Sequence, residues 1–147
     1  MADTWQKLIL FHGFEDALFE KLTKGVTAIL SQETQVTMAA ISQNHLPLSV
    51  EETILGLIEN PGQVLRDNPV VAGEKLVVYI HGFPREELFN LVNGFKMLLP
   101  DRKAVAFCTS TKNNISMILG AMIEEVLGDH AYMTRPRSAP VLENSQP

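Results

Sequence analysis

One short segment occurs twice in the chain, and this repetition constrains the fold more than any other feature. Leu8–Phe14 reads LILFHGF and Leu76–Phe83 reads LVVYIHGF, so that His12 and His81 stand 81 − 12 = 69 positions apart. An apolar run ending in His-Gly-Phe is typical of a strand followed by a sharp turn, because glycine adopts backbone conformations that other residues avoid. We therefore expect two diverged copies of one structural unit.

Each copy continues in the same order. Apolar residues recur at spacings of three and four after both His-Gly-Phe segments, which predicts a helix. A short apolar run follows, Val36–Ile41 in the first copy and Ala104–Cys108 in the second, and then a polar loop and another helical pattern. The helix after the first loop opens with the capping box of Ser49–Glu52. Its counterpart is expected to start near Asn113 or Asn114 and to stop at Gly128.

This order predicts an α/β fold made of two β-α-β-α repeats, at about residues 7–60 and 75–130. Helix-length connections favour parallel strands within each copy. Because either copy alone would expose an apolar sheet face and an edge, we expect one shared four-stranded sheet packed by helices, in a single domain of residues 1–132. The pattern leaves open whether the copies join by parallel extension or across a pseudo-two-fold axis. Residues 133–147 lack apolar periodicity and predict a disordered tail.

Charge and cysteine content narrow the classes of partner. The net charge is −5, and the 12 Lys and Arg residues are scattered, so we expect no nucleic-acid partner. One cysteine excludes an intramolecular disulfide, and no histidine stands at metal-ligand spacing, so no metal is expected. The apolar run Leu8–Phe11 is too short for a signal peptide or a membrane span. We therefore predict a cytoplasmic protein without a membrane partner.

The polar loop after the second apolar run is the predicted ligand site. Ligands of open α/β sheets bind beyond the carboxyl ends of strands, where helix N-termini offer free amides, and an anionic small molecule suits such a place. The candidate residues are His12, His81, Gly82, Thr109, Ser110, Thr111, Lys112, Asn113 and Asn114. The alternative is that the loop residues only cap a helix and close a turn. The familiar glycine-rich phosphate loops are absent, so no cofactor is expected.

Two functions from different classes follow from these residues. The first, which we favour, is a non-enzymatic module that binds a small ligand or another protein, because no catalytic set is recognisable. A homodimer through the Met- and Ile-rich last helix is one form of it. The second is a small hydrolase or transferase that uses Cys108 or a hydroxyl of Thr109–Thr111 with a histidine base. A lone cysteine is more often a small buried apolar residue than a nucleophile.

The second half also resembles a known family. HGFPREELFNLVNGF and KAVAFCTSTKNNISMILGAMIEEVLGDH are similar to the signature of the bacterial DUF3783 family, a domain of unknown function. The matching features are Gly82-Phe83, Glu86-Glu87, Thr109-Ser110-Thr111, Asn113-Asn114 and Asp129-His130. The segment LILFHGFEDALFEKL is similar to the first half of that signature. The family has no established activity, so the resemblance implies no catalytic residue or cofactor.

Overall fold

The computed structural model describes residues 7–30, 35–71, 76–99 and 105–134 of the chain. The strands are β1 (Lys7–His12), β2 (Val36–Ala40), β3 (Val64–Leu65), β4 (Leu76–His81) and β5 (Val105–Thr109). The helices are α1 (Asp16–Ile29), α2 (Val50–Leu57), α3 (Arg85–Leu98), α4 (Leu119–Thr134) and the short 3-10 helix η1 (Gln43–His45). No described helix is long and apolar enough to span a membrane.

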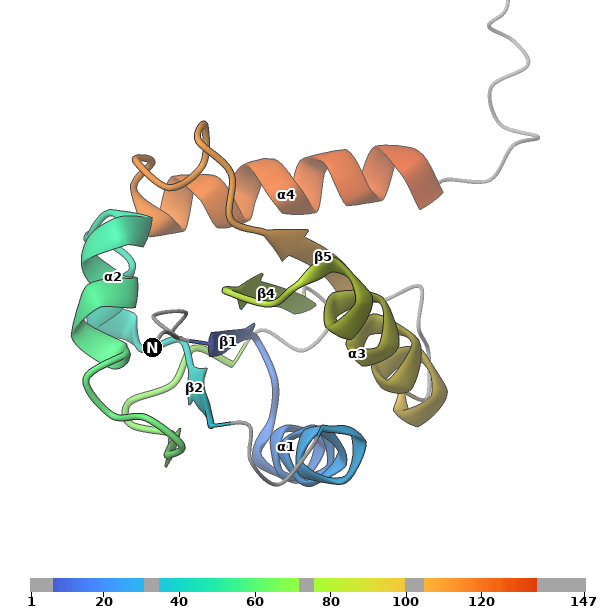
Figure 1. The fold of residues 1–147 in the computed structure, drawn as a ribbon. Coiled ribbons are helices and arrows are strands. Elements are labelled where there is room, and N and C mark those ends of the chain that lie inside the picture. Colours follow the sequence, from blue (N-terminus) through green and yellow to red (C-terminus); the bar gives the residue numbers. More distant parts are fainter. Residues whose placement is uncertain (1–6, 31–34, 72–75, 100–104, 135–147) are drawn as a thin grey trace, which may run out of the picture.

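The strands form one five-stranded sheet in the order β3-β2-β1-β4-β5 (Figure 1). All neighbouring strands are parallel except β1 and β4, which pair antiparallel with Leu8 opposite His81 and His12 opposite Val77. The fold class is therefore α/β as predicted, but the expected count of four strands was wrong. Strand β3 was missed because two residues after Pro61-Gly62 are too few to show any alternation.

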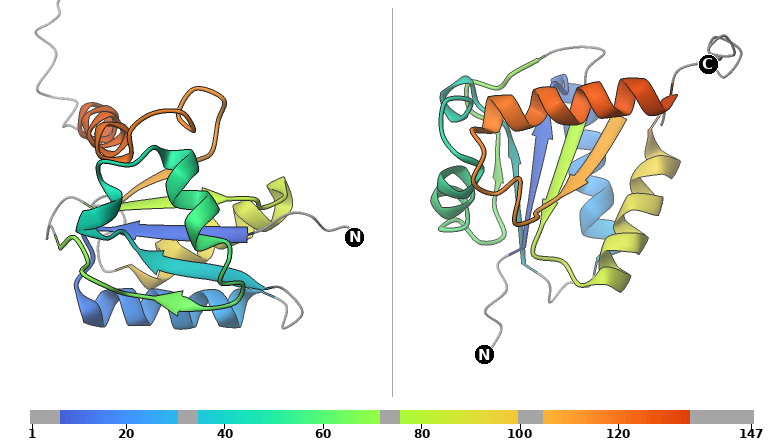
Figure 2. Two further views of the ribbon diagram at one scale, coloured as in Figure 1. Left: turned by 90° about the vertical axis from the view of Figure 1, so that its left-hand side faces the viewer. Right: turned by 90° about the horizontal axis from the view of Figure 1, so that it is seen from above.

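Helices cover both faces of the sheet, and alternation along the strands divides the core accordingly (Figure 2). Ile9 and Phe11 of β1 join the cluster under α1 and α3, whereas Leu8 and Leu10 join the cluster under α2 and α4. Successive side chains of a strand point to opposite faces, so β1 contributes to both clusters. In β4, Val78 and Ile80 face α1 and α3, and Tyr79 faces α2 and α4.

Corresponding elements of the two halves begin a constant distance apart in the sequence. Strand β4, helix α3, strand β5 and helix α4 start 69 positions after β1, α1, β2 and α2 (76 − 7, 85 − 16, 105 − 36 and 119 − 50). Contacts between the halves are reciprocal at the same spacing. The amide of Val50 donates to the Met117 carbonyl at 2.8 Å, and the amide of Leu119 donates to the Leu48 carbonyl at 2.7 Å.

Two local predictions are confirmed at the turns and caps. Gly13 and Gly82 have φ angles of 90° and 86°, in the region that glycine adopts at little cost, so both His-Gly-Phe segments turn as predicted. The Ser49 hydroxyl accepts from the Glu52 amide, and the Glu52 carboxylate accepts from the Ser49 amide, which is the predicted capping box.

The predicted limits of the last helix were wrong at both ends. Helix α4 starts at Leu119 rather than near Asn113 or Asn114, and it continues through Gly128 to Thr134. A glycine inside a helix costs only about 1 kcal/mol relative to alanine, and it does not stop a helix whose neighbouring residues pack on the sheet. Of the predicted tail, residues 133 and 134 therefore belong to α4. Residues 135–147 and Ala104 lie outside the described part of the chain.

Candidate functional site

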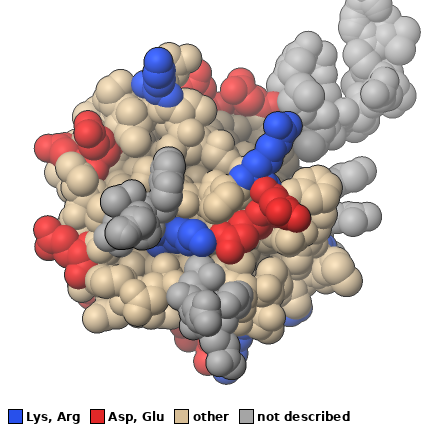
Figure 3. Space-filling view, in the orientation of Figure 1, with Lys and Arg blue, Asp and Glu red and all other residues tan. Residues whose placement is uncertain are grey.

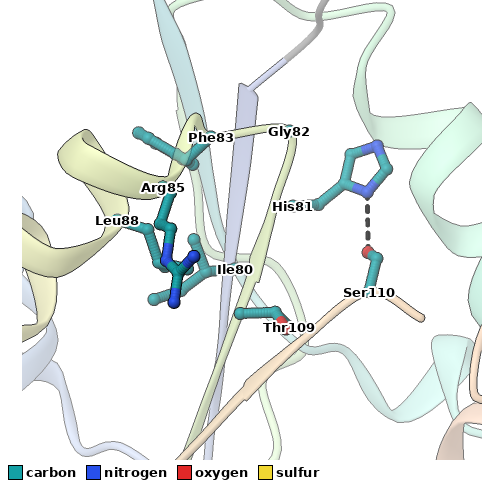
Figure 4. Close-up of a pocket in the computed structure, with 8 residues that line it drawn as sticks. All are labelled: Ile80, His81, Gly82, Phe83, Arg85, Leu88, Thr109 and Ser110. Carbon is teal, nitrogen blue, oxygen red and sulfur yellow. Dashed lines mark hydrogen bonds between the residues drawn. The ribbon is translucent and has the colours of Figure 1, made fainter.

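A pocket of about 340 Å³ lies where β4 and β5 end and α3 begins. Its lining comes from those three elements and from the residues that directly follow the two strands, and it consists of Ile80, His81, Gly82, Phe83, Arg85, Leu88, Thr109 and Ser110. Figure 4 shows Arg85 and Leu88 on the α3 side of β4, and His81 and Ser110 on its other side. Four of the residues that the sequence singled out, namely His81, Gly82, Thr109 and Ser110, are therefore brought together.

A chain of hydrogen bonds organises the polar side of this pocket. The Ser110 hydroxyl lies 2.7 Å from Nδ1 of His81 and 2.7 Å from the Tyr79 hydroxyl. The Tyr79 hydroxyl donates to Oδ1 of Asn114 at 3.2 Å. Alternation places Tyr79 two residues before His81 on the same face of β4, which is why both side chains reach the loop after β5. Ser110 is thus held between a phenol and an imidazole.

Burial keeps both of these titratable groups uncharged at neutral pH. Removal from water raises the pKa of Tyr79 to about 12, and the hydrogen bond from Ser110 opposes this shift only in part. Burial likewise lowers the pKa of His81 below its ordinary value of 6.5. A neutral imidazole carries one proton, and Nδ1 can act as a base toward Ser110 only in the tautomer that has this proton on Nε2.

Arg85 brings a positive charge to the α3 side of the pocket. It is exposed and makes no ion pair or hydrogen bond with the described residues. It is the first residue of α3, whose N-cap, Pro84, provides no side-chain hydrogen bond to the helix amides. On the face seen in Figure 3, Lys and Arg form small separate patches with Asp and Glu between them. The charge of Arg85 stands at the pocket that this residue lines.

The exposed part of the polar loop lies outside this pocket. The Thr111 amide donates to Oδ1 of Asn114 at 3.0 Å, and the Asn114 amide donates to Oγ1 of Thr111 at 3.1 Å. Asn114 also donates to the Thr109 carbonyl at 2.8 Å. These bonds close the turn and do not cap α4, since α4 begins five residues later. Lys112 and Asn113 are exposed and do not line the pocket.

His12 lies far from the polar loop, against our expectation. Because β1 and β4 are antiparallel neighbours, their C-termini point in opposite directions, and His12 and His81 lie at opposite ends of the two strands. His12 is buried, with 8% of its surface exposed, and its Nδ1 has no hydrogen-bond partner among the described residues. Burial lowers its pKa below 6.5. It therefore contributes to the covered end of the first half and not to the pocket.

Cys108 is poorly suited to act as a nucleophile. It is half-buried, and its sulfur contacts Nδ2 of Asn114 and the carbonyl of Thr109, each at 3.6 Å. Burial raises the pKa of its thiol, and the nearby Glu125 raises it further. The thiolate is the reactive form, so this environment suppresses reactivity at neutral pH.

Two residues of the site, Tyr79 and Arg85, were not predicted from the sequence. Tyr79 could have been found from strand alternation, because it stands two residues before His81. Arg85 could have been found as the position that opens the helix after the His-Gly-Phe turn, 69 positions after Asp16. Among the residues that the structure describes, no group of three or more His, Cys, Asp or Glu side chains is placed to hold a metal ion.

Comparison with known proteins supports one resemblance. The family model described as Domain of unknown function (DUF3783) matches residues 77–133, which run from β4 into α4 and include the whole pocket lining. The first half lies outside this match. No curated protein matches the chain, and no solved structure matches it. The second half, with its pocket, thus resembles a family whose function is not established.

Proposed function

We propose that the protein is a non-enzymatic binding module whose pocket at the ends of β4 and β5 takes a small anionic ligand. The observation that carries this proposal is Arg85, a cation without a partner among the described residues, in a pocket that also contains the hydroxyls of Thr109 and Ser110. A guanidinium group presents a fork of N–H donors that matches carboxylate and phosphate oxygens.

The start of α3 supports the same ligand chemistry. The first amides of a helix have no partner within the helix, and they carry the positive end of its dipole. The first turn has two carboxylates: Glu86 is exposed, and Glu87 pairs with Lys7 at 2.6 Å, so that the ammonium group of Lys7 offsets its charge. An anion beside Arg85 therefore meets a side-chain cation and a favourable helix end together.

Calorimetric titration with inorganic phosphate and with succinate tests this function. We expect one of these anions to bind, and Arg85→Ala to weaken its binding by about tenfold, in keeping with the loss of one charge-assisted hydrogen bond. Lys112→Ala is the matched control, because it removes an exposed cation outside the pocket. Equal weakening by the two substitutions, or no binding of either anion, would contradict the proposal.

A second candidate function is hydrolysis with Ser110 as the nucleophile and His81 as the base. Their 2.7 Å contact favours it, since a nucleophile and its base must be within hydrogen-bond reach. Against it, no carboxylate among the described residues contacts the other ring nitrogen of His81 to orient the imidazole. Turnover of an activated ester such as p-nitrophenyl acetate by the purified protein, lost in Ser110→Ala and retained in Lys112→Ala, would support this reaction. Equal rates in both variants would exclude it.

We also infer that the two halves diverged from one β-α-β-α unit. This origin is supported by the constant spacing of 69 positions between corresponding elements. It is also supported by the reciprocal hydrogen bonds between the segments that lead into α2 and α4. If so, residues 76–134 expressed alone should pair through β4 as a dimer, and a stably folded monomer in sedimentation would contradict the inference. Cytoplasmic location and self-association of the full chain stay predictions from the sequence.

A further inference from the structure

The end of the first half shows how a strand end of this fold can be covered. Arg66 lies over it: its guanidinium donates to the Phe14 carbonyl at 3.1 Å and pairs with Asp16 at 3.4 Å. The same group stands 5.2 Å from the centre of the Phe19 ring. These three residues form a seat for one charged side chain, with an anion, an aromatic ring and a backbone acceptor around it.

The pocket is the counterpart of this seat in the second half. The residues 69 positions after the three partners of Arg66 are Phe83, Arg85 and Leu88, and all three line the pocket. Lys7 lies over part of this site, with Nζ 5.5 Å from the centre of the Phe83 ring, but no described side chain pairs with Arg85. The charge of the seat is reversed, because Arg85 stands where the first half has Asp16. The open seat therefore suits an acidic side chain.

Backbone pairing extends the comparison beyond one side chain. In the first half, the segment Pro69–Val71 crosses the strand ends and forms bridges with Ser42 and Gly13. The Gly13 amide donates to the Val70 carbonyl at 3.1 Å, and the Val70 amide donates to the Ile41 carbonyl at 2.9 Å. The counterparts of Gly13 and Ile41 are Gly82 and Ser110, whose corresponding amide and carbonyl make no such bond within the described ranges. Within the part of the chain that the structure describes, this amide and this carbonyl are available to pair with an extended chain.

We propose that this pocket binds an extended peptide of a partner protein, which places a carboxylate side chain against Arg85 and pairs its backbone with Gly82 and Ser110. The proposal rests on the anion-binding function proposed above and names its macromolecular ligand. Addition of an extended peptide to exposed backbone groups is a common mode of recognition, in which main-chain bonds give affinity and side-chain pockets give specificity. Charge reversal at the seat sets the specificity here.

Two synthetic peptides test the proposal against the full-length protein. One has the chain's own sequence Val64–Val71, and the other carries Arg66→Glu in that peptide. We expect the Glu peptide to bind at least about tenfold more tightly than the Arg peptide, because only its carboxylate meets Arg85. The protein variant Arg85→Glu should reverse this preference, and Lys112→Ala should keep it. Equal affinity of the two peptides for the unaltered protein would overturn the proposal.

Other outcomes separate this proposal from the function on which it rests. If succinate or phosphate binds through Arg85 but neither peptide binds, the peptide ligand is wrong and the anion-binding function stands. If neither the anions nor the peptides bind, both are wrong.

Two further occupants would also overturn it. Residues 137–142 read Arg-Ser-Ala-Pro-Val-Leu, which is similar to Arg66–Val71, although Arg137 would oppose Arg85. Binding of the Glu peptide only after removal of residues 135–147 would identify this segment of the chain as the occupant. Dimerisation that Arg85→Glu abolishes would identify a second copy.

Discussion

The end of β1 and β2 and the end of β4 and β5 have the same strand–turn–helix backbone but differ in the side chains and segments around them. Near the end of β1 and β2, Leu10, Ala40 and Ile41 are buried and apolar, and the segment from Arg66 to Val71 covers this end. At the end of β4 and β5 the counterparts of Leu10, Ala40 and Ile41 are Tyr79, Thr109 and Ser110, and no segment that the structure describes crosses the pocket. The same strand–turn–helix arrangement therefore stabilises the fold at the end of β1 and β2, and it presents polar groups to a ligand at the end of β4 and β5.

The largest contrast is expected from the core residues beneath the two ends. Phe11 is 1% exposed and packs edge-on against Phe14, Phe19 and Phe95, with ring centres 5.2 to 6.0 Å apart. Phe11→Ala should lower the free energy of unfolding by about 3–5 kcal/mol. Its counterpart substitution Ile80→Ala should cost about 2 kcal/mol, because the space it leaves adjoins the open pocket. Urea denaturation measures both changes in the free energy of unfolding. A larger decrease for Ile80→Ala than for Phe11→Ala would contradict this difference between the two ends.

Arg66 and Arg85 should also differ in their contribution to the free energy of unfolding, although by less than the two core residues. Arg66→Ala removes the hydrogen bond to Phe14 and the contact with Phe19, so we expect a loss of about 1–2 kcal/mol in the free energy of unfolding. Arg85→Ala removes an exposed side chain without described partners and should change that free energy by less than about 0.5 kcal/mol. Thermal denaturation of the two variants checks the pair. Similar losses would show that Arg85 also has a structural role.

Acid should destabilise the protein through its buried histidines. Burial lowers the pKa of His12, so the unfolded chain binds a proton more tightly than the folded one. The free energy of unfolding should therefore fall as the pH falls below about 6.5, by at most about 1.4 kcal/mol per pH unit for each such group. His12→Leu should flatten this dependence between pH 7.5 and 5.5 more than His81→Leu does, since His81 is only half-buried. An unchanged slope in His12→Leu would refute the assignment.

The smallest effect is expected from a substitution in the part of α4 that extends beyond the length of α2. Gly128 lies inside α4, and a Cβ atom there would meet no other atom within 4 Å. Gly128→Ala should therefore raise the free energy of unfolding by about 0.5–1 kcal/mol, through better helix propensity. If the helix instead ended at this glycine, as the sequence predicted, alanine would be destabilising. Circular dichroism during urea denaturation distinguishes the two.

Features that depend on a few neighbouring residues were predicted correctly from the sequence. The His-Gly-Phe turns and the Ser49–Glu52 capping box were found because a few neighbouring residues suffice for them. The antiparallel pairing of β1 with β4 was left open because it depends on contacts far apart in the chain. The start of α4 was misplaced because Asn114 has the chemistry of a helix cap and is used in a tight turn instead.

The candidate site was predicted in part for the same reason. His81, Gly82, Thr109 and Ser110 follow adjacent parallel strands, so their proximity could be expected from the sequence. His12 was assigned to the same place because the relative direction of β1 and β4 was unknown. Arg85 was missed because a cation in the first turn of a helix is unfavourable there, and its role depends on the pocket that only the folded chain forms.

We propose that this protein binds its ligand at the end of β4 and β5. A ¹H–¹⁵N NMR titration of the full chain with the Glu peptide tests it most directly. We predict shifts at the amides of Gly82, Arg85 and Ser110, and none at their counterparts Gly13, Asp16 and Ile41. Shifts confined to the first half, or absent from the pocket while the peptide is bound, would contradict the claim.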